Sequence, residues 1–432
     1  MEADPTRMCE LLVGLGEVDL VGIGDGGGDE PLEVVIRSRR PRPTCDDCGS
    51  RLWSKGYRTV VLVDLPAFGR PVRLRWRKRR WACPNPGCAV GSFVEQDPGI
   101  GPERALLTSR AARWVTVQVG KLGRPVDEVA TELGCGWHTV NNEVARWGEA
   151  LLEADTSRVG QVEAVGVDET LFWRQGRWRT KVWCTSVVDV GGRQLIDIVA
   201  GRTAESAARW FRSQPVEWRD GIRWAVLDMS GPYRTAYDRV LPNAAQVADP
   251  FHVIRLANQR LDEVRRRVQN ETLGHRGRKH DPLYRIRRLL TSASERISDR
   301  GRIRLRGLLD AGDPHGEVRT AWHAKETVRG IYQIDSIPTA LRYTLQLADD
   351  LQHESCPPEI NKLGRTIARW TPQIANWHIS KVTNGPTEAL NNLIKRIKRT
   401  AFGFRNFANY RIRALLYAGK PNWNLLTTIT PH

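Results

Sequence analysis

The sequence predicts an α+β protein built from several domains. Its 432 residues allow about two to four domains with ample buried core. Three observations support this class. Two pairs of closely spaced cysteines lie near the N-terminus, apolar segments that end in acids lie in the middle, and a long basic stretch with helical periodicity follows them. These patterns are typical of a small metal-bound domain, of strands in an α/β core and of a helical region, respectively.

The charge of the chain indicates its partner. There are 66 Lys and Arg against 49 Asp and Glu, a net charge of +17. Residues 255–306 hold 16 basic and 6 acidic residues, and residues 395–413 hold seven basic residues and no acid. DNA is the favoured partner, because each neutralised phosphate releases counterions. No run of about 18 apolar residues occurs and the N-terminus is acidic and polar, so we expect no membrane span, no signal peptide and a cytoplasmic protein.

The first element is a predicted zinc ribbon within a domain over residues 1–100. Cysteines occur as the pairs Cys45/Cys48 and Cys83/Cys88, separated by a 34-residue interval that alternates like strands at 60–63 and 72–77. In a reduced compartment this spacing brings four thiolates to one tetrahedral Zn²⁺, and four protein ligands leave no open position for chemistry. We therefore expect structural zinc; four unligated buried thiols are the alternative. The other four cysteines are scattered singly, which is not a disulfide framework.

The next element, a domain over residues 101–155, is predicted to read DNA. Residues 125–133 form an amphipathic helix that begins at a proline, Gly-Cys-Gly at 134–136 forms a turn, and residues 137–147 form a second helix. This is the helix-turn-helix form, and an ordinary helical hairpin is the alternative. The net charge and the neighbouring zinc ribbon favour DNA reading. The residues expected to face base edges are His138, Thr139, Asn141 and Asn142.

Two short apolar strands in the middle of the chain end in acids. Residues 163–167 are followed by Asp168 and Glu169, and residues 224–227 are followed by Asp228. A third acid, Glu388, opens a helix late in the chain. Each acid alone is better explained as a solvated carboxylate. Three carboxylates that converge need a compensating charge, which hard divalent cations supply, so the working hypothesis is a two-metal phosphodiester site.

The order of the elements around these acids predicts how they meet. A meander of three antiparallel strands, a helix and a fourth strand is the ribonuclease-H-like plan, in which the first and fourth strands are neighbours. Asp168 and Asp228 would then lie together. His252 follows a fifth strand, and the pattern alone does not distinguish it from a structural histidine. The elements after the first strand are expected at 181–188, 194–199, 204–212, 223–227 and 245–252, within a first part of the core over 160–255, and Asp189 is expected in the turn of the hairpin.

The remainder is predicted to be an insertion and a final core segment. Residues 256–380 are helical by pattern, very basic and too long for a connection, so we interpret them as a helical insertion. Residues 381–432 hold the last core element, a helix from 387 to about 401 with one apolar face. Its polar face carries Glu388, Asn391, Asn392, Lys395, Lys398 and Arg399. This face is either solvated or directed at metal and the DNA backbone.

Several motifs occur in a familiar order between about residues 34 and 420: CxxCG…CPNPGC, VGVDE, LDMSGPYRTA, ADPFHVIRLANQRLDEVRR and TNGPTEALNNLIKRIKRTAFGFRNFANYRIR. Together they closely resemble the bacterial DDE transposases of the ISL-three insertion-sequence family. The resemblance implies that Asp168, Asp228 and Glu388 are the Mg²⁺ (or Mn²⁺) ligands and that His252 is an auxiliary near the scissile phosphate. Asp249 and His252 match the acid-x-x-His signature of the family. Pro250 departs from it, because a basic residue is common there.

The resemblance also implies a reaction and partners. Cleavage would free a 3′-OH at the end of the element, and the same site would join that end to target DNA. The zinc ribbon and the helix-turn-helix would bind terminal inverted repeats, and Asn392, Lys395, Lys398 and Arg399 would follow the DNA backbone. Two ends held together imply at least a homodimer, associated with the nucleoid in the bacterial cytoplasm.

Other functions stay open at this point. A zinc and helix-turn-helix regulator would use only the N-terminal half and would leave the acid-bearing strands unexplained. A ribonuclease-H-like nuclease without joining activity shares every residue named above. A decayed copy is a third possibility, against which the intact set of acids argues.

Overall fold

The computed structural model describes residues 4–28 and 30–431. Residues 1–3 lie outside the described residues. They are part of the acidic and polar N-terminus that predicts no signal peptide. The chain forms two compact units. Unit 1 comprises residues 1–158 and 393–432, and unit 2 comprises residues 159–392. Residues 393–432 were predicted to belong to the catalytic core. In the structure they belong to the same compact unit as the N-terminal residues.

Unit 1 begins with a sheet in the order β1-β2-β4-β3, and β5 pairs with β4. β3 and β4 are long antiparallel strands joined by a tight turn at Phe68 and Gly69, both of which have positive φ. Alternate residues of β4, including Leu74 and Trp76, are buried under the sheet. The sequence patterns at 60–63 and 72–77 therefore lie within longer strands. The elements are α1 (Pro5–Val13), β1 (Val18–Gly24), β2 (Leu32–Ser38), β3 (Trp53–Ala67), β4 (Arg70–Ala82) and β5 (Ser92–Val94).

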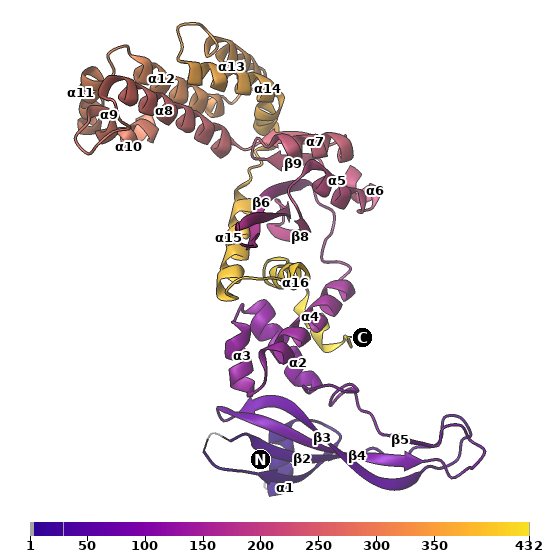
Figure 1. The fold of residues 1–432 in the computed structure, drawn as a ribbon. Coiled ribbons are helices and arrows are strands. Elements are labelled where there is room, and N and C mark those ends of the chain that lie inside the picture. The colour runs from indigo at the N-terminus through magenta and orange to yellow at the C-terminus, as the bar shows by residue number, and fades with distance from the viewer. Residues whose placement is uncertain (1–3, 29, 432) are drawn as a thin grey trace. The chain divides into compact units, whose positions relative to one another are not determined.

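The second part of unit 1 is helical and includes the C-terminus (Figure 1). Val144 and Leu151 of α4 share one core with Ile412 and Leu416 of α16. Gly148 permits this approach, because a Cβ there would lie 2.8 Å from side-chain carbons of Ile412 and Leu416. The elements are α2 (Ser109–Thr116), the π-helical turn η1 (Val117–Lys121), α3 (Val126–Leu133), α4 (Trp137–Ala154), α16 (Phe407–Ala418) and η4 (Trp423–Thr427).

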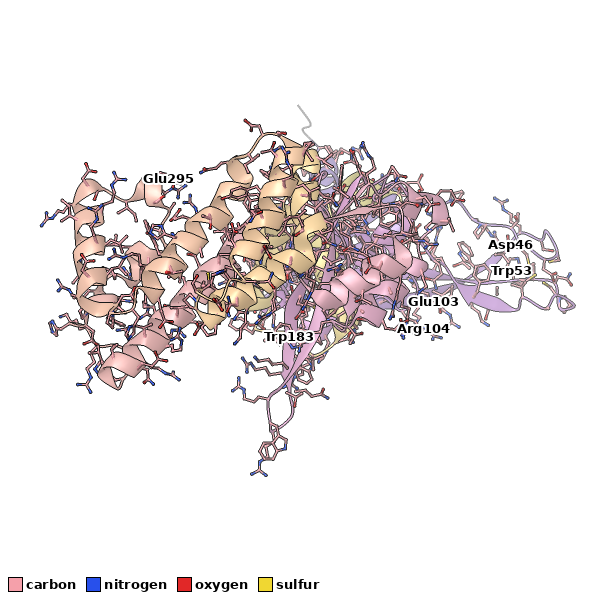
Figure 2. All side chains as sticks on the ribbon, turned by 90° about the horizontal axis from the view of Figure 1, so that it is seen from above. Asp46, Trp53, Glu103, Arg104, Trp183 and Glu295 are labelled. Atoms are coloured by element: carbon pink, nitrogen blue, oxygen red, sulfur yellow. The ribbon has the colours of Figure 1, made fainter. Side chains whose placement is uncertain are left out.

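Unit 2 contains a five-stranded sheet in the order β10-β9-β6-β7-β8. β6, β7 and β8 are an antiparallel meander, and β9 and β10 run parallel to β6. The expected neighbourhood of the first and fourth strands is thus confirmed. Beyond its parallel partner, β6 continues with β7 as a hairpin that projects from the sheet, where Trp183 is labelled in Figure 2. The elements are β6 (Ala164–Gln175), β7 (Thr180–Asp189), β8 (Gln194–Ala200), α5 (Ala204–Arg212), α6 (Val216–Asp220), β9 (Trp224–Leu227), α7 (Gly231–Val240) and β10 (Ala245–Ala248).

An array of helices lies between β10 and α15, the segment for which a helical insertion was predicted. Their apolar faces share one core with the sheet, from Val165 through Leu261 to Ile374. No helix among residues 4–28 and 30–431 is both long and apolar enough to span a membrane. The elements are α8 (Pro250–Leu273), α9 (Pro282–Arg285), α10 (Arg287–Thr291), η2 (Ser294–Arg296), α11 (Asp299–Gly312), α12 (Glu317–Gly330), η3 (Ile331–Gln333), α13 (Ile337–Asp350), α14 (Pro358–Ser380) and α15 (Gly385–Thr400).

Candidate functional site

Three aspartates lie level with one another across the sheet of unit 2. Gly166 of β6 pairs with Val226 of β9, and Leu227 of β9 pairs with Ala248 of β10. Continuing these registers places Asp168, Asp228 and Asp249 side by side where β9 and β10 end. The parallel strands therefore deliver carboxylates to one edge, as is usual for sites in α/β sheets.

The strand that carries Asp168 is longer than the sequence pattern indicated. It was expected to end at 167, but β6 runs to Gln175 because residues 169–175 pair with β7. Asp168 thus lies in mid-strand, at the point where the parallel partner β9 stops at Leu227. Glu169, the next acid, forms an ion pair with Arg202 at 3.1 Å.

The start of α15 packs directly against β6. Gly166 makes this possible, because a Cβ there would lie 2.4 Å from Thr387 Oγ1 and 2.9 Å from Asn384 Oδ1. The Asn384 backbone N–H donates to Asp249 Oδ2 at 2.5 Å, and the Asn384 side-chain amide donates to Asp228 Oδ1. Asn384 and Thr387 are fully buried. The turn before α15 is therefore hydrogen-bonded to two of the three aspartates. These bonds fix the start of α15, whose first turn carries Glu388.

His252 joins the acids of β9 and α15. Its Nε2 lies 3.3 Å from Asp228 Oδ2 and 3.0 Å from Glu388 Oε1. The first turn of α8 positions the ring, because Asp249 caps that helix by accepting from the backbone N–H groups of Phe251 and His252. Pro250 occupies the first helical position, where its fixed φ is favourable. The departure from the family signature thus starts the helix that carries His252.

Asn391 holds Asp168 in place and was not singled out from the sequence. Its Nδ2 donates to Asp168 Oδ2 at 2.6 Å, and its Oδ1 accepts from Ser186 Oγ at 2.8 Å and from Thr170 Oγ1 at 3.1 Å. The helical pattern assigned Asn391 to the polar face of α15, but the residue is buried at 1 % exposure. At Asn391 this polar face is therefore not solvated, because β6 and β7 present polar groups to it. The position of Asn391 one turn after Glu388 is the one signal that could have identified it.

The electrostatics of this edge favour a bound cation. Burial raises the pKa of Asp228 to about 6, the positive charge of His252 opposes that rise, and the negative charge of Asp168 adds to it. One carboxylate oxygen of Asp228 and one of Glu388 also lie within 3.3 Å of the same atom, His252 Nε2. Carboxylate oxygens crowded in this way suit a hard divalent ion, which relieves their repulsion. Asp168, Asp228 and Glu388 offer oxygen donors of the kind that such an ion takes, but among the described residues their ligand atoms do not all lie within 4.8 Å of one another.

The four paired cysteines of unit 1 form a compact thiol cluster. Cys45, Cys48, Cys83 and Cys88 have sulfur atoms all within 4.8 Å of one another, and they are the one group of three or more potential metal ligands this close in the described part of the chain. Pairing of Trp53 with Ala82 at the open end of β3 and β4 brings the two cysteine loops together. Sulfurs on a tetrahedral Zn²⁺ with bonds of about 2.3 Å stand roughly 3.8 Å apart. The Cys45–Cys88 and Cys48–Cys83 distances of 3.6 and 3.4 Å fit this ion.

The residues predicted to bind DNA lie on helix surfaces. In the first turns of α4, His138 and Asn142 are exposed and Thr139 and Asn141 are half-buried. In α15, Asn392, Lys395 and Arg399 are exposed and Lys398 is half-buried. The turn before α4 has the expected glycine at a positive φ of 61°, Gly134. These groups are therefore available to a ligand.

Comparison with known families agrees with the geometry of both clusters. The family model described as "Transposase", of the ISL3 (ISL-three) type, matches residues 165–414, more than half of the chain. The model described as "zinc-finger of transposase IS204/IS1001/IS1096/IS1165" matches residues 41–88, which include all four clustered cysteines. The chain belongs to the ISL3 transposase family.

Relatives of this transposase family include characterised insertion-sequence proteins. The chain is 27% identical over 382 residues to the transposase for insertion sequence element IS1001 of Bordetella parapertussis, covering 87% of this chain and 88% of that protein. It is 24% identical over 312 residues to the transposase for insertion sequence element IS1557 of Mycobacterium tuberculosis, covering 68% of this chain and 67% of that protein. As an ISL3 transposase with a zinc-finger domain, the protein is a DNA-acting enzyme of an insertion sequence.

Proposed function

We propose that this transposase cleaves the ends of its insertion sequence and joins them to target DNA at the edge formed by β6, β9 and α15. The observation that carries the proposal is the convergence of Asp168, Asp228 and Glu388, which are remote in sequence, around His252 and two buried asparagines. The strand order and directions support a ribonuclease-H-like core, in which the first and fourth strands bear the first two acids.

Each residue has a role that follows from its contacts. Asp168, Asp228 and Glu388 are the proposed ligands of Mg²⁺ or Mn²⁺. Bound there, two such ions would activate the attacking water or 3′-OH and stabilise the leaving oxygen. His252 orients Asp228 and Glu388, and its proposed further role is to contact the scissile phosphate. Because one set of groups serves both hydrolysis and joining, no covalent protein–DNA intermediate is required.

Recognition is proposed to reside in unit 1. The pair α3 and α4, with the glycine-containing turn between them, supports a helix-turn-helix. The side chains proposed to face base edges are His138, Thr139, Asn141 and Asn142. The zinc ribbon and the exposed cations of α15 would contact phosphates, which fix register without reading sequence. Terminal inverted repeats are the proposed ligand, and pairing of two ends implies a homodimer or larger assembly on DNA.

The test compares Asp228→Asn with Asp189→Asn, a matched substitution in the same sheet. Asp189 was expected in the β7–β8 turn but is the last residue of β7, because it pairs with Val165 and Gln194. Its Oδ1 accepts from the Gly192 backbone N–H at 2.9 Å, a bond that asparagine can also accept. With full-length protein, Mg²⁺ and duplexes carrying the element ends, we expect Asp228→Asn to cleave about a thousandfold more slowly, because metal clamps contribute several kcal/mol. Its DNA affinity should stay within about twofold of wild type, since phosphate and groove contacts set that affinity.

Two results would contradict the proposal. Equal cleavage by Asp228→Asn and Asp189→Asn would remove Asp228 from the reaction. Pre-cleaved ends with a free 3′-OH provide the second assay, because a transposase joins them to target DNA and a nuclease does not. Cleavage without any joined product would establish a nuclease instead.

A further inference from the structure

A pocket of about 490 Å³ lies within unit 1, between the start of α4 and the segment that follows α15. The start of α4 contributes Trp137, His138, Asn141 and Asn142, the segment between α15 and α16 contributes residues 401–406, and α16 contributes Asn409 and Arg413. The helix-turn-helix proposal uses the outer surface of α4. This pocket adds a second chain segment beside that surface.

Arg413 is a buried cation that lacks an anionic partner. It is 3 % exposed, and within residues 4–28 and 30–431 its Nε and Nη2 atoms have no hydrogen-bond acceptor. The ring of Phe404, 5.8 Å from its Cζ, is the partner the structure gives it. Burial alone lowers the pKa of this guanidinium, to about 10, and no neighbouring carboxylate offsets it. An uncompensated buried charge is costly, so the site is built for an anion that the protein does not supply.

Aromatic and basic groups accompany Arg413 in the pocket. Phe402 is 94 % exposed and has a φ of 53°, a left-handed conformation that is unfavourable for a bulky residue. Its exposed ring gains no burial in the protein to offset that conformation. Trp137 is also exposed, and Arg405 is an exposed second cation. Among the described lining residues there is one acid, Asp127, which is exposed in the first turn of α3.

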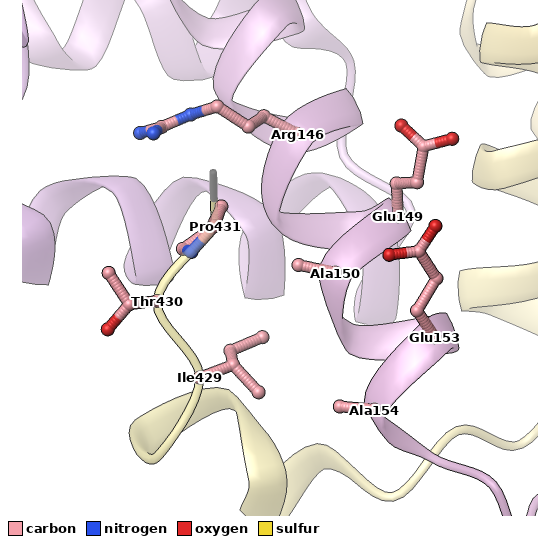
Figure 3. Close-up of a pocket in the computed structure, with 8 residues that line it drawn as sticks. All are labelled: Arg146, Glu149, Ala150, Glu153, Ala154, Ile429, Thr430 and Pro431. Atoms are coloured by element: carbon pink, nitrogen blue, oxygen red, sulfur yellow. The ribbon is translucent and has the colours of Figure 1, made fainter.

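A second pocket of unit 1 serves as a contrast (Figure 3). It has the same volume, but Ala150 and Ala154 face the C-terminal segment while Glu149 and Glu153 point away from it. Its cation, Arg146, is already paired with Glu143 at 2.6 Å. No unsatisfied charge is directed at a ligand there, so volume alone does not distinguish a binding site.

We propose that the pocket at Arg413 binds one nucleotide of a DNA strand, with its phosphate on Arg413 and Arg405 and its base against the rings of Trp137 and Phe402. A phosphate supplies the missing anion, and bases stack on aromatic side chains regardless of sequence. The inference rests on the proposed function, because it assumes that unit 1 grips DNA. The further proposal is that one nucleotide leaves the base stack of the bound duplex beside α4.

The first test uses exposed residues and matched controls. Phe402→Ala is compared with Phe68→Ala, since Phe68 is 88 % exposed with a φ of 52° in another turn of unit 1. Binding of the full chain to a duplex of its element end is measured by fluorescence anisotropy, with each base replaced in turn by an abasic site. We expect Phe402→Ala to bind about tenfold more weakly, the scale of one lost base stack. At one DNA position, removal of the base should weaken wild type but not Phe402→Ala.

The second test removes the buried charge. Arg413→Met keeps an unbranched apolar stem about as long as the aliphatic part of arginine and removes the buried charge, so we expect a Tm equal to or above that of wild type. In Arg413→Met the slope of log Kd against log salt concentration should decrease by the equivalent of about one phosphate contact. The slope should be unchanged in Arg104→Ala, which removes an exposed arginine elsewhere. A structural role for Arg413 would instead lower the Tm and leave the salt dependence unchanged.

These outcomes separate this inference from the proposed function. If wild type cleaves element ends but Phe402→Ala and Phe68→Ala bind equally, the pocket proposal is wrong and the enzyme proposal stands. Displacement of DNA by micromolar deoxyadenosine monophosphate would also overturn it, by showing a site for free nucleotides. Absence of Mg²⁺-dependent cleavage with intact abasic discrimination would support the pocket and contradict the active site.

Discussion

The cysteine cluster of unit 1 and the acid site of unit 2, the proposed magnesium site, are held in shape by different means. The cysteine cluster of unit 1 brings four thiols within 4.8 Å of one another, on loops joined by the end of the β3–β4 pair, a small core around Leu52 and Trp81, and a bond from Cys88 to Asp47. In the acid site of unit 2 each carboxylate has a protein partner: Asn391 for Asp168, Asn384 for Asp228 and His252 for Glu388. We therefore predict that the cysteine cluster depends on its ion for its structure, whereas the acid site has a framework of protein hydrogen bonds that does not.

Among the changes that test this difference between the two sites, removal of zinc should have the largest effect on folding. We expect Cys83→Ser, or treatment with a chelator, to abolish folding of the zinc-ribbon region, because structural Zn²⁺ contributes on the order of 10 kcal/mol. Zinc content, thermal unfolding and DNA affinity should fall together. Cys356→Ser, which changes a half-buried thiol in unit 2, is the control and should keep its zinc. A zinc-free protein with unchanged unfolding would contradict a structural role.

Loss of the asparagine that braces Asp168 should have an intermediate effect. Asn391→Ala removes the partner of Asp168, Ser186 and Thr170 at once, so the free energy of unfolding should fall by about 2–4 kcal/mol. Asn392→Ala changes the next, exposed residue of the same helix and should alter it by less than about 0.5 kcal/mol. Denaturant unfolding measures both. Equal stability of the two variants would show that the framework around Asp168 is not formed.

A methyl group at the contact between β6 and α15 should have the smallest effect. In Gly166→Ala the new Cβ would meet Thr387 and Asn384, so the helix start must shift, at a cost of about 1–3 kcal/mol. Cleavage should fall more than DNA binding, because the shift moves Glu388. Gly160→Ala is the matched control, since nothing lies within 4 Å of a Cβ there. Full cleavage activity in Gly166→Ala would mean that this contact does not position Glu388.

The two sites also differ in how far the sequence could predict them. The cysteine spacing predicted its cluster directly, because the ligands are paired in sequence and one hairpin closes the rest. Asp168 and Asp228 were predicted from strand order, since parallel neighbours share a register. Helical periodicity placed Asn391 on a polar face, but it could not decide whether that face is solvated, because it cannot show that β7 offers Ser186 to it. The extent of β6 was missed for a related reason, since pairing with β7 prolongs the strand beyond its apolar pattern.

The most direct measurement is a Mn²⁺ titration of the DNA complex, followed by electron paramagnetic resonance, for wild type, Asp168→Asn, Asp228→Asn and Glu388→Gln. We expect wild type to bind Mn²⁺ at the edge formed by β6, β9 and α15. Each single substitution should weaken Mn²⁺ binding at least about tenfold, because all three carboxylates share the ions. Undiminished Mn²⁺ binding in any one of the three variants would contradict a site made jointly by these residues.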